Sequence, residues 1–473
     1  MSGRAAEAAG LLSATASAAE IAAGVRARRV TAAAVVAAAL ERIAGGDRAV
    51  NTFTTVLAES ARAEAARVDR VVGGGGDAGP LAGVPFAVKN LFDVAGVVTV
   101  AGSRIHAGRP PAARDATAVA ALRRAGAVLV GALNMDEYAY GFSTENSHHG
   151  PARNPHDHGR IAGGSSGGSG AAVAAGFVPL ALGTDTNGSI RVPAALCGVF
   201  GLKPTFGRVS RAGVVPLAWS LDHVGPLARS VRDLALAFDA LQGADATDPV
   251  CTERAPEPCT PELDRGLDGL RLAVAGEHFA RLAAPEALAA LDRVRRALGV
   301  TREVVIPEAH RARAAAMVVT ACEGSAYHLA DLRTRAKDFD PMTRDRFLAG
   351  ALLPAALYTR AQRFRAWYRA RVLEVFRDVD VVLAPATPYP APLVGAPRTT
   401  TVDGAEVFTR AHLGVFTQPL SFVGLPVLAA PVAGAGALPL GVQLVAAPFR
   451  EGALLRVAAQ LEAEGVVAAP VAR

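Results

Sequence analysis

Residues 81–89 read LAGVPFAVK, an apolar run that ends on a lysine. A short apolar run of this kind predicts a buried strand, here with a charge at its carboxyl end. A helix predicted over residues 117–125 and a second apolar strand over residues 127–133 follow along the chain. Because buried strands that alternate with helices favour a sheet covered on both faces, the sequence predicts an α/β protein with a mixed, mostly parallel sheet.

The same pattern extends towards both ends of the chain. Residues 17–70 are predicted to be helical, and an Arg-rich helix over residues 356–377 precedes an apolar strand at residues 379–384. The uncharged stretch 419–449 contains five prolines, which predict short buried strands joined by turns. We expect one domain over residues 1–473, in which a Pro-rich excursion (243–270) separates a first part (17–242) from helices and C-terminal strands (271–473).

The composition excludes several classes of protein. Hydrophobic residues are 51% and charged residues 19%, which is too apolar for a disordered chain. The net charge of +6 is spread without a run of basic residues, and prolines interrupt the longest apolar stretch, so neither a nucleic acid nor a membrane is an expected partner. Four cysteines without a CxxC pair, and Glu7 within the N-terminal apolar stretch, predict a cytoplasmic protein.

Lysine is rare in this chain. Only Lys89, Lys203 and Lys337 are lysines among the 49 basic residues, and the others are arginine. A buried lysine can lose its proton because desolvation lowers its pKa, whereas arginine stays protonated. Lys89, at the end of the predicted strand, is therefore a candidate general base.

Two segments rich in small residues follow, GGSSGGSG at residues 163–170 and GTDTNGSIR at residues 183–191, with a short helix and a strand (177–182) between them. A phosphate-binding loop would need a lysine in the first segment, and none is present. A match of residues 164–168 to the G-x-S-x-G nucleophile elbow is weak, because a loop-like segment rather than a strand precedes it. The third interpretation is a catalytic site, formed by Lys89, Ser165 and Ser189, in which a serine attacks an amide. An amide is a poor electrophile, so the attacking serine needs a base and an oxyanion site.

Taken together, these segments resemble the amidase signature family. The resemblance covers nearly the whole chain from about residue 17 and is carried by residues 83–89, 163–169, 185–193, 198–205, 424–426 and 439–443. It implies a single α/β/α domain and a Ser-cis-Ser-Lys triad that needs no metal and no cofactor. Ser189 would be the nucleophile, Lys89 the base, and Ser165, behind a cis Gly164–Ser165 peptide, the proton relay.

The resemblance assigns further roles in the same two segments. The backbone N–H groups of Thr186, Asn187, Gly188 and Ser189 would form the oxyanion hole, and Asn187 departs from the glycine that is common at its position. The supporting residues around the triad would be Ser166, Ser169, Asp185 and Arg191. The expected reaction passes through an acyl-enzyme and releases ammonia.

Two branches of the family compete for this chain. Residues 134–141 and 143–146 are similar to the glutaminase component of the glutamyl-tRNA(Gln) amidotransferase, its A-type chain. Residues 134–157, 186–189, 361–365 and 383–388 are more similar to the carboxybiuret hydrolase subunit of cyanuric acid breakdown, which works with a small helical accessory subunit. We therefore favour a small urea-like amide, 1-carboxybiuret, as substrate, and a homodimer or heterotetramer. A broad-specificity aliphatic amidase and a non-catalytic binding subunit on the same fold are the other hypotheses.

Residues that bind the substrate are harder to identify. A carboxylated substrate needs a cation, for which Arg160, Arg191 and Arg363 are unranked candidates, and Tyr138 is a further candidate contact. Four histidines (His148, His149, His156 and His158) lie close together in the sequence, but no familiar ligand spacing accompanies them. We expect a polar loop over the active-site mouth there rather than a metal site.

Overall fold

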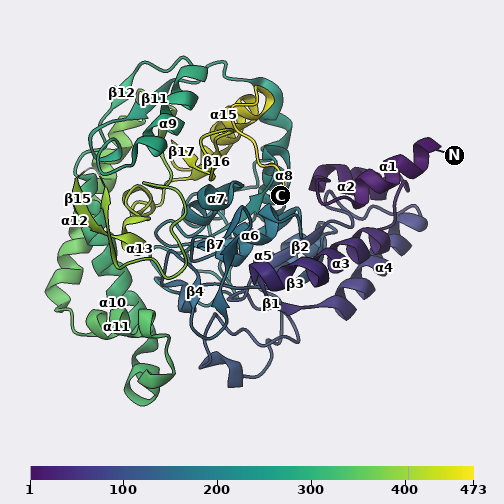
Figure 1. Ribbon diagram of the computed structural model, residues 1–473, viewed down its shortest axis with the longest axis horizontal. Helices are drawn as coiled ribbons and strands as arrows, with labels where there is room; N and C mark the ends of the chain where they lie inside the picture. The colour runs from purple at the N-terminus through teal and green to yellow at the C-terminus, as the bar shows by residue number, and fades with distance from the viewer. Residues whose placement is uncertain (1, 403, 473) are drawn as a thin grey trace.

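The run at residues 81–89 ends in β2 (Pro85–Lys89), an entirely buried strand near the middle of one half of a large sheet. The computed structural model describes residues 2–402 and 404–472 (Figure 1). In spatial order the strands of the 11-stranded sheet are β1 (Phe53–Val56), β3 (Val128–Leu133), β2, β8 (Leu180–Asp185), β10 (His223–Ala228), β9 (Phe200–Lys203), β16 (Val427–Pro431), β17 (Gly441–Ala446), β13 (Val381–Pro385), β11 (Leu272–Ala275) and β12 (Glu303–Val304).

The directions of these strands correct one prediction. Strands β3, β2 and β8 are parallel, as the alternation of helices and strands predicted, and β13, β11 and β12 are also parallel. The six remaining pairings that the structure describes in this sheet are antiparallel, so the sheet is mixed but not mostly parallel. Periodicity indicates that a strand is buried but carries no information about the direction of its neighbour, which explains the error.

Helices cover both faces of this sheet, which is the predicted α/β/α arrangement. On one face α6 and α7 pack together against the central strands, and on the other α8 packs with α5 and α15. The helices are α1 (Ser2–Leu12), α2 (Ala18–Arg26), α3 (Ala32–Val50), α4 (Ala58–Gly73), α5 (Thr117–Arg124), α6 (Gly167–Ala174), α7 (Arg191–Cys197), α8 (Val231–Leu241), α9 (Pro285–Ala297), α10 (Ala309–Arg335), α11 (Pro341–Ala351), α12 (Ala355–Val375), α13 (Thr409–His412), α14 (Gln418–Ser421) and α15 (Glu451–Ala463).

Among the described residues, three small pairs of strands lie outside the main sheet. They pair β4 (Glu145–Asn146) with β5 (Gly150–Pro151), β6 (Arg153–Asn154) with β7 (Asp157–Ile161), and β14 (Thr399–Val402) with β15 (Ala405–Phe408). The histidine-rich segment of the sequence belongs to the first two hairpins and the turns between them.

The predicted helix and strand positions agree with the structure in most places. Strands β16 and β17 lie in the proline-containing stretch 419–449, and α12 and β13 match the predicted helix and strand before it. The segment 17–70 was predicted to be entirely helical, but it contains β1, which pairs with β3. This four-residue strand depends on a partner far along the chain, so it has no strong local signal. The subdivision at residues 243–270 stays a prediction.

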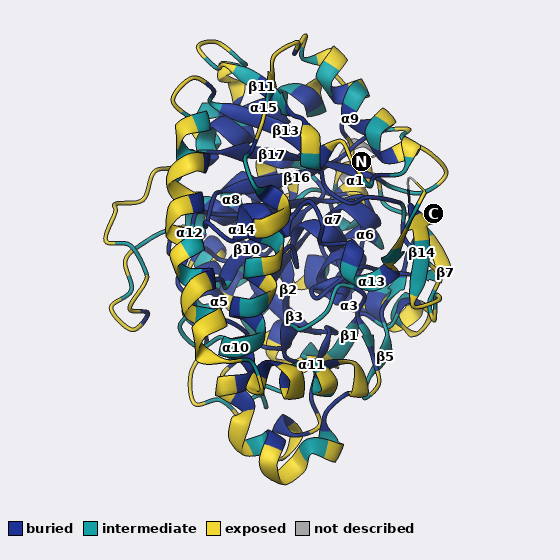
Figure 2. Ribbon diagram, turned by 90° about the vertical axis from the view of Figure 1, so that its left-hand side faces the viewer, coloured by how far each residue is buried: buried dark blue, intermediate teal, exposed yellow. Residues whose placement is uncertain are grey.

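Helices α10, α11 and α12 form a layer at one side of the molecule. Figure 2 shows them with exposed outer faces over the buried strands of the sheet. Helix α10 contacts both α11 and α12, and it also contacts α14. Among the described residues, no helix is both long enough and apolar enough to cross a membrane.

The N-terminal helices are joined to the core by a buried carboxylate. The side chain of Ser17 caps α2 locally by accepting from Glu20 N, and Asp233 of α8 completes the cap. The two Asp233 carboxylate oxygens accept from Ala18 N at 2.8 Å and from Ala19 N at 2.9 Å. Because the first N–H groups of a helix have no partner within it, this contact fixes α2 against α8.

We expect Asp233→Ala to lower the free energy of unfolding by about 1–3 kcal/mol, since one buried and one partly buried N–H group lose their acceptor. The midpoint of thermal unfolding should fall while the catalytic constants stay unchanged. The control is Asp264→Ala, which removes only an exposed ion pair with Arg232 and should have almost no effect. Equal stabilities of the two variants would contradict the assignment of Asp233 as a cap.

Candidate active site

Lys89 lies at the carboxyl end of β2 and is completely buried. Its Nζ donates hydrogen bonds to Ser165 Oγ at 2.7 Å and to Thr184 Oγ1 at 2.9 Å. Strands β2 and β8 are parallel neighbours, so their carboxyl ends meet at one edge and bring Thr184 beside the amine. Thr184 was not among the residues predicted for the site. The signal that could have identified it is its position near the carboxyl end of a buried strand, the same position that Lys89 has in β2.

The surroundings of Lys89 favour the neutral amine. Burial lowers its pKa to about 7, and the carboxylates of Asp136, Asp222 and Asp185 oppose that shift only in part. Both hydrogen-bond partners of the amine are hydroxyl groups, so no carboxylate neutralises its charge directly. At neutral pH a substantial fraction of Lys89 is therefore deprotonated.

Ser165 follows a cis Gly164–Ser165 peptide bond, as predicted. Next to it, Ser166 N donates to the carbonyl of Ser189 at 3.2 Å, so the two serine-containing turns adjoin. The hydroxyl groups of Ser166 and Ser169 donate to the carbonyls of Thr184 and Leu182, which fixes this turn and α6 to β8. The structure thus brings Lys89, Ser165 and the turn that carries Ser189 to one place.

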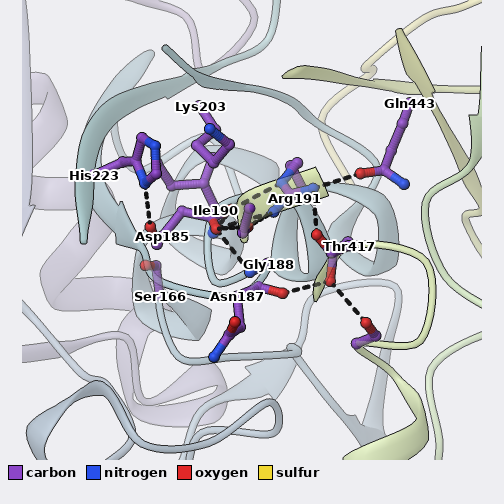
Figure 3. A network of polar contacts seen from close by, with 12 residues as sticks. Ser166, Asp185, Asn187, Gly188, Ile190, Arg191, Lys203, His223, Thr417 and Gln443 are labelled. Carbon is purple, nitrogen blue, oxygen red and sulfur yellow. Dashed lines mark hydrogen bonds and ion pairs between the residues drawn. The ribbon is translucent and has the colours of Figure 1, made fainter. Parts of the chain in front are cut away.

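The turn between β8 and α7 is held from inside by Asp185. Its carboxylate accepts from Gly188 N at 2.7 Å and from Ile190 N at 3.2 Å (Figure 3). Gly188 was predicted to contribute its N–H to the oxyanion hole, and this prediction is wrong, because the N–H donates to Asp185. The N–H groups of Thr186, Asn187 and Ser189 remain as candidates.

Arg191 completes this network and is fully buried with Asp185. Its guanidinium donates to both Asp185 oxygens, at 2.9 and 3.0 Å, and to Gln443 Oε1 at 2.6 Å (Figure 3). Further bonds reach the Thr417 carbonyl and the Ser421 hydroxyl. Burial alone would raise the pKa of Asp185, but Arg191 holds it well below its usual value. Arg191 therefore has a structural role, and its assignment as a cation for the substrate is wrong.

A cavity of about 320 Å³ opens beside Ser189. The turn contributes Thr186, Asn187 and Ser189 to its lining, and the segment 139–142 contributes four more residues. Helices α10 and α11 supply most of the rest. Their lining residues are Met317, Val318, Thr320, Ala321, Arg346, Ala349 and Gly350. The cavity is mostly apolar, with a few polar groups close to the serine, which is typical of a small-molecule site.

The other three residues predicted to bind the substrate do not lie in this lining either. Tyr138 is buried in an aromatic cluster with His328 and Phe347, at ring distances of 3.9 and 6.2 Å. Arg160 lies on the β7 hairpin, where it binds Asp157 and the Ala391 carbonyl. Arg363 is exposed on α12. The placement of these side chains therefore contradicts their predicted role.

Arg346 of α11 is the arginine that does line the cavity. Its Nη1 donates to the Tyr140 carbonyl at 2.9 Å, and its guanidinium lies 5.4 Å from the centre of the Tyr140 ring. The sequence does not reveal this residue, because α11 carries more than one arginine and the periodicity of the helix does not indicate which of them faces the cavity.

The histidine-rich segment does not form a metal site in the part of the chain that the structure describes. His148 Nε2 pairs with Glu137 at 3.1 Å, and His156 Nε2 lies 3.0 Å from the Cys197 carbonyl. These contacts hold the hairpins to the core.

Comparison with known proteins agrees with this geometry. The Amidase family model matches residues 34–455. AtzE, a 1-carboxybiuret hydrolase subunit from Pseudomonas sp. strain ADP, is 53% identical over 449 residues, which are 94% of this chain and 98% of that protein. The A-type chain of the glutamyl-tRNA(Gln) amidotransferase of Chromohalobacter salexigens is 40% identical over 94% of this chain and 95% of its own length.

A solved structure supports the same relationship. It is described as a vestigial protein complex that reveals the evolutionary origins of an s-triazine catabolic enzyme, and it superimposes with a TM-score of 0.94 at 52% identity, covering 96% of this chain and 99% of its own. With the family model and these relatives spanning nearly the whole sequence, the chain belongs to the amidase family and is an amide-hydrolysing enzyme.

Proposed function

We propose that this protein hydrolyses the terminal amide of a small urea-like substrate, 1-carboxybiuret, and releases ammonia. The observation that carries the proposal is the cavity beside Ser189, whose turn adjoins the buried Lys89–Ser165 pair. The choice of substrate follows the relative named 1-carboxybiuret hydrolase, which is 53% identical. The A-type amidotransferase chains, at about 40% identity, support a glutaminase activity less strongly.

In the proposed mechanism Ser189 Oγ attacks the amide carbon while its proton passes through Ser165 to neutral Lys89. The N–H groups of the 186–189 turn that are not bonded to Asp185 stabilise the oxyanion. The proton then returns through Ser165 to the leaving nitrogen, the C–N bond breaks, and ammonia departs. Water attacks the resulting acyl-Ser189, with the same residues transferring its proton, and frees the acid.

Arg346 is the side chain that we propose for the substrate carboxylate. It is a cation in the wall of the cavity, and its donation to the Tyr140 carbonyl fixes its position. A guanidinium matches the geometry of a carboxylate and stays charged at every relevant pH. The surrounding lining is mainly apolar, which strengthens the attraction between the two charges.

The assembly that we propose contains a small accessory chain in a heterotetramer, with a homodimer as the alternative. The related solved structure is described as a protein complex, and this description supports the proposal. The cytoplasmic location also stays a prediction.

We expect Ser189→Ala to reduce ammonia release from 1-carboxybiuret by about 10³-fold or more, because no other group replaces the nucleophile. Ser147→Ala, at an exposed serine on a hairpin, is the matched control and should keep full activity. The measurement is ammonia production by the purified protein, alone and with a candidate accessory chain. A fully active Ser189→Ala variant would rule out the mechanism, and a preference for glutamine over 1-carboxybiuret would move the function to the amidotransferase branch.

The pH dependence should follow Lys89. Since the deprotonated amine is the active form and its pKa is about 7, kcat/KM should rise with pH through about 7 and then level off. A neutral substrate such as malonamide removes the ionisation of a substrate carboxylate from the profile. In Asp136→Asn the midpoint should move to lower pH, because Asp136 raises the pKa of Lys89. A profile that falls as the pH rises through this range would exclude a lysine base.

Arg346→Gln should raise KM for 1-carboxybiuret by about ten- to a hundredfold, the range expected for one charge-assisted hydrogen bond. For neutral malonamide the change should be much smaller, because it has no carboxylate. Arg160→Gln and Arg363→Gln are matched controls that remove arginines lying away from the cavity. An equal effect of Arg346→Gln on both substrates would contradict carboxylate binding.

A further inference from the structure

Asn187 occupies an unusual position in the cavity lining. It lies two residues before Ser189 in the same turn, and both residues line the cavity. Its carbonyl accepts from Thr417 Oγ1 at 2.6 Å, and its side-chain Nδ2 donates to Thr320 Oγ1 of α10 at 2.8 Å. Thr320 also lines the cavity. The residue is therefore held by contacts with Thr417 and with α10.

The hydrogen bonds of Thr320 determine the orientation of the carboxamide. A threonine hydroxyl has a single proton, and that proton goes to the Ala316 carbonyl at 2.8 Å. Towards Asn187 the hydroxyl can only accept, so the carboxamide must present its NH₂ group to Thr320. Its oxygen, Oδ1, is then directed away from Thr320.

The amide oxygen has no partner in this arrangement. Asn187 is only 8% exposed, and Oδ1 is a buried atom that makes no hydrogen bond to any of the described residues. Buried acceptors are almost always satisfied, and exceptions need an explanation. A buried acceptor that is fixed in orientation, beside a cavity that holds the nucleophile, is suited to accept a hydrogen bond from a bound molecule.

We propose that Asn187 is a specificity-determining residue that accepts a hydrogen bond from the N–H group on the acyl side of a urea-type substrate, and that Thr320 is the positioning residue that holds its oxygen for this contact. The inference rests on the proposed function and deepens it. In a simple carboxamide the carbonyl carbon carries one nitrogen, which leaves as ammonia. In a urea-type substrate a second nitrogen remains on the acyl side through the acyl-enzyme. An acceptor near Ser189 can distinguish the two classes by this N–H group.

Biuret and malonamide provide a matched pair for the test. They differ only in that the central N–H of biuret is a CH₂ group in malonamide, and neither carries the carboxylate that Arg346 would bind. The readout is the ratio of kcat/KM for biuret to kcat/KM for malonamide, so a general loss of activity cancels. For a compound that binds without being cleaved, the reciprocal of its inhibition constant against 1-carboxybiuret hydrolysis replaces kcat/KM.

In Asn187→Leu, which keeps the size of the side chain but removes the acceptor, this ratio should fall by about tenfold relative to the wild type. Thr320→Val should lower the ratio in the same direction, because the carboxamide loses the contact that orients it. Thr320→Ser keeps the hydroxyl and should keep the ratio. An unchanged ratio in both Asn187→Leu and Thr320→Val would overturn the inference. A wild-type protein that releases no ammonia from 1-carboxybiuret would instead contradict the proposed function.

Discussion

The active site depends on one buried ion pair, between Asp185 and Arg191. Both side chains have no exposed surface, and breaking such a pair leaves an uncompensated charge in the interior. Both side chains make further hydrogen bonds to the surrounding protein. Asp185 accepts from Gly188 N and Ile190 N in the turn, and Arg191 donates to Gln443 in β17. The turn that carries Ser189 is thus attached to a strand of the C-terminal half.

Lys89 is equally buried but has no oppositely charged group bonded to it. Here the hydrogen-bond partners of the amine are hydroxyl groups, so desolvation is compensated only in part and lowers its pKa to about 7. Burial disfavours the charged form of both groups, but Arg191 keeps Asp185 ionised, whereas Lys89 has no such partner and its neutral form is favoured. The difference lies in the hydrogen-bonding partner. Arginine could not act as the proposed base at this position, because a guanidinium stays protonated, although the chain otherwise uses arginine almost throughout.

In the proposed mechanism, recognition of the substrate and the chemistry use different parts of the chain. The serine turns and Lys89 lie at the ends of central strands, whereas Thr320 and Arg346 belong to α10 and α11, which cover the cavity from outside. Asn187 connects the two, because it is part of the turn and donates to α10. A change in these helices can therefore alter specificity without disturbing the sheet that positions the reacting groups.

The sequence by itself determined the fold class and the central residues of the site. Lys89, Ser165 and Ser189 stand out locally, because a lysine that ends an apolar strand and serines between glycines are visible without any partner. Strand β1, the antiparallel half of the sheet, the occupied Gly188 N–H and the cavity positions of Arg346 and Thr320 were decided only by the tertiary structure. Each of these depends on a contact between residues far apart in the chain or on the local path of the folded backbone. A sequence pattern shows which residues are apolar or charged, but not which groups they contact in the folded protein.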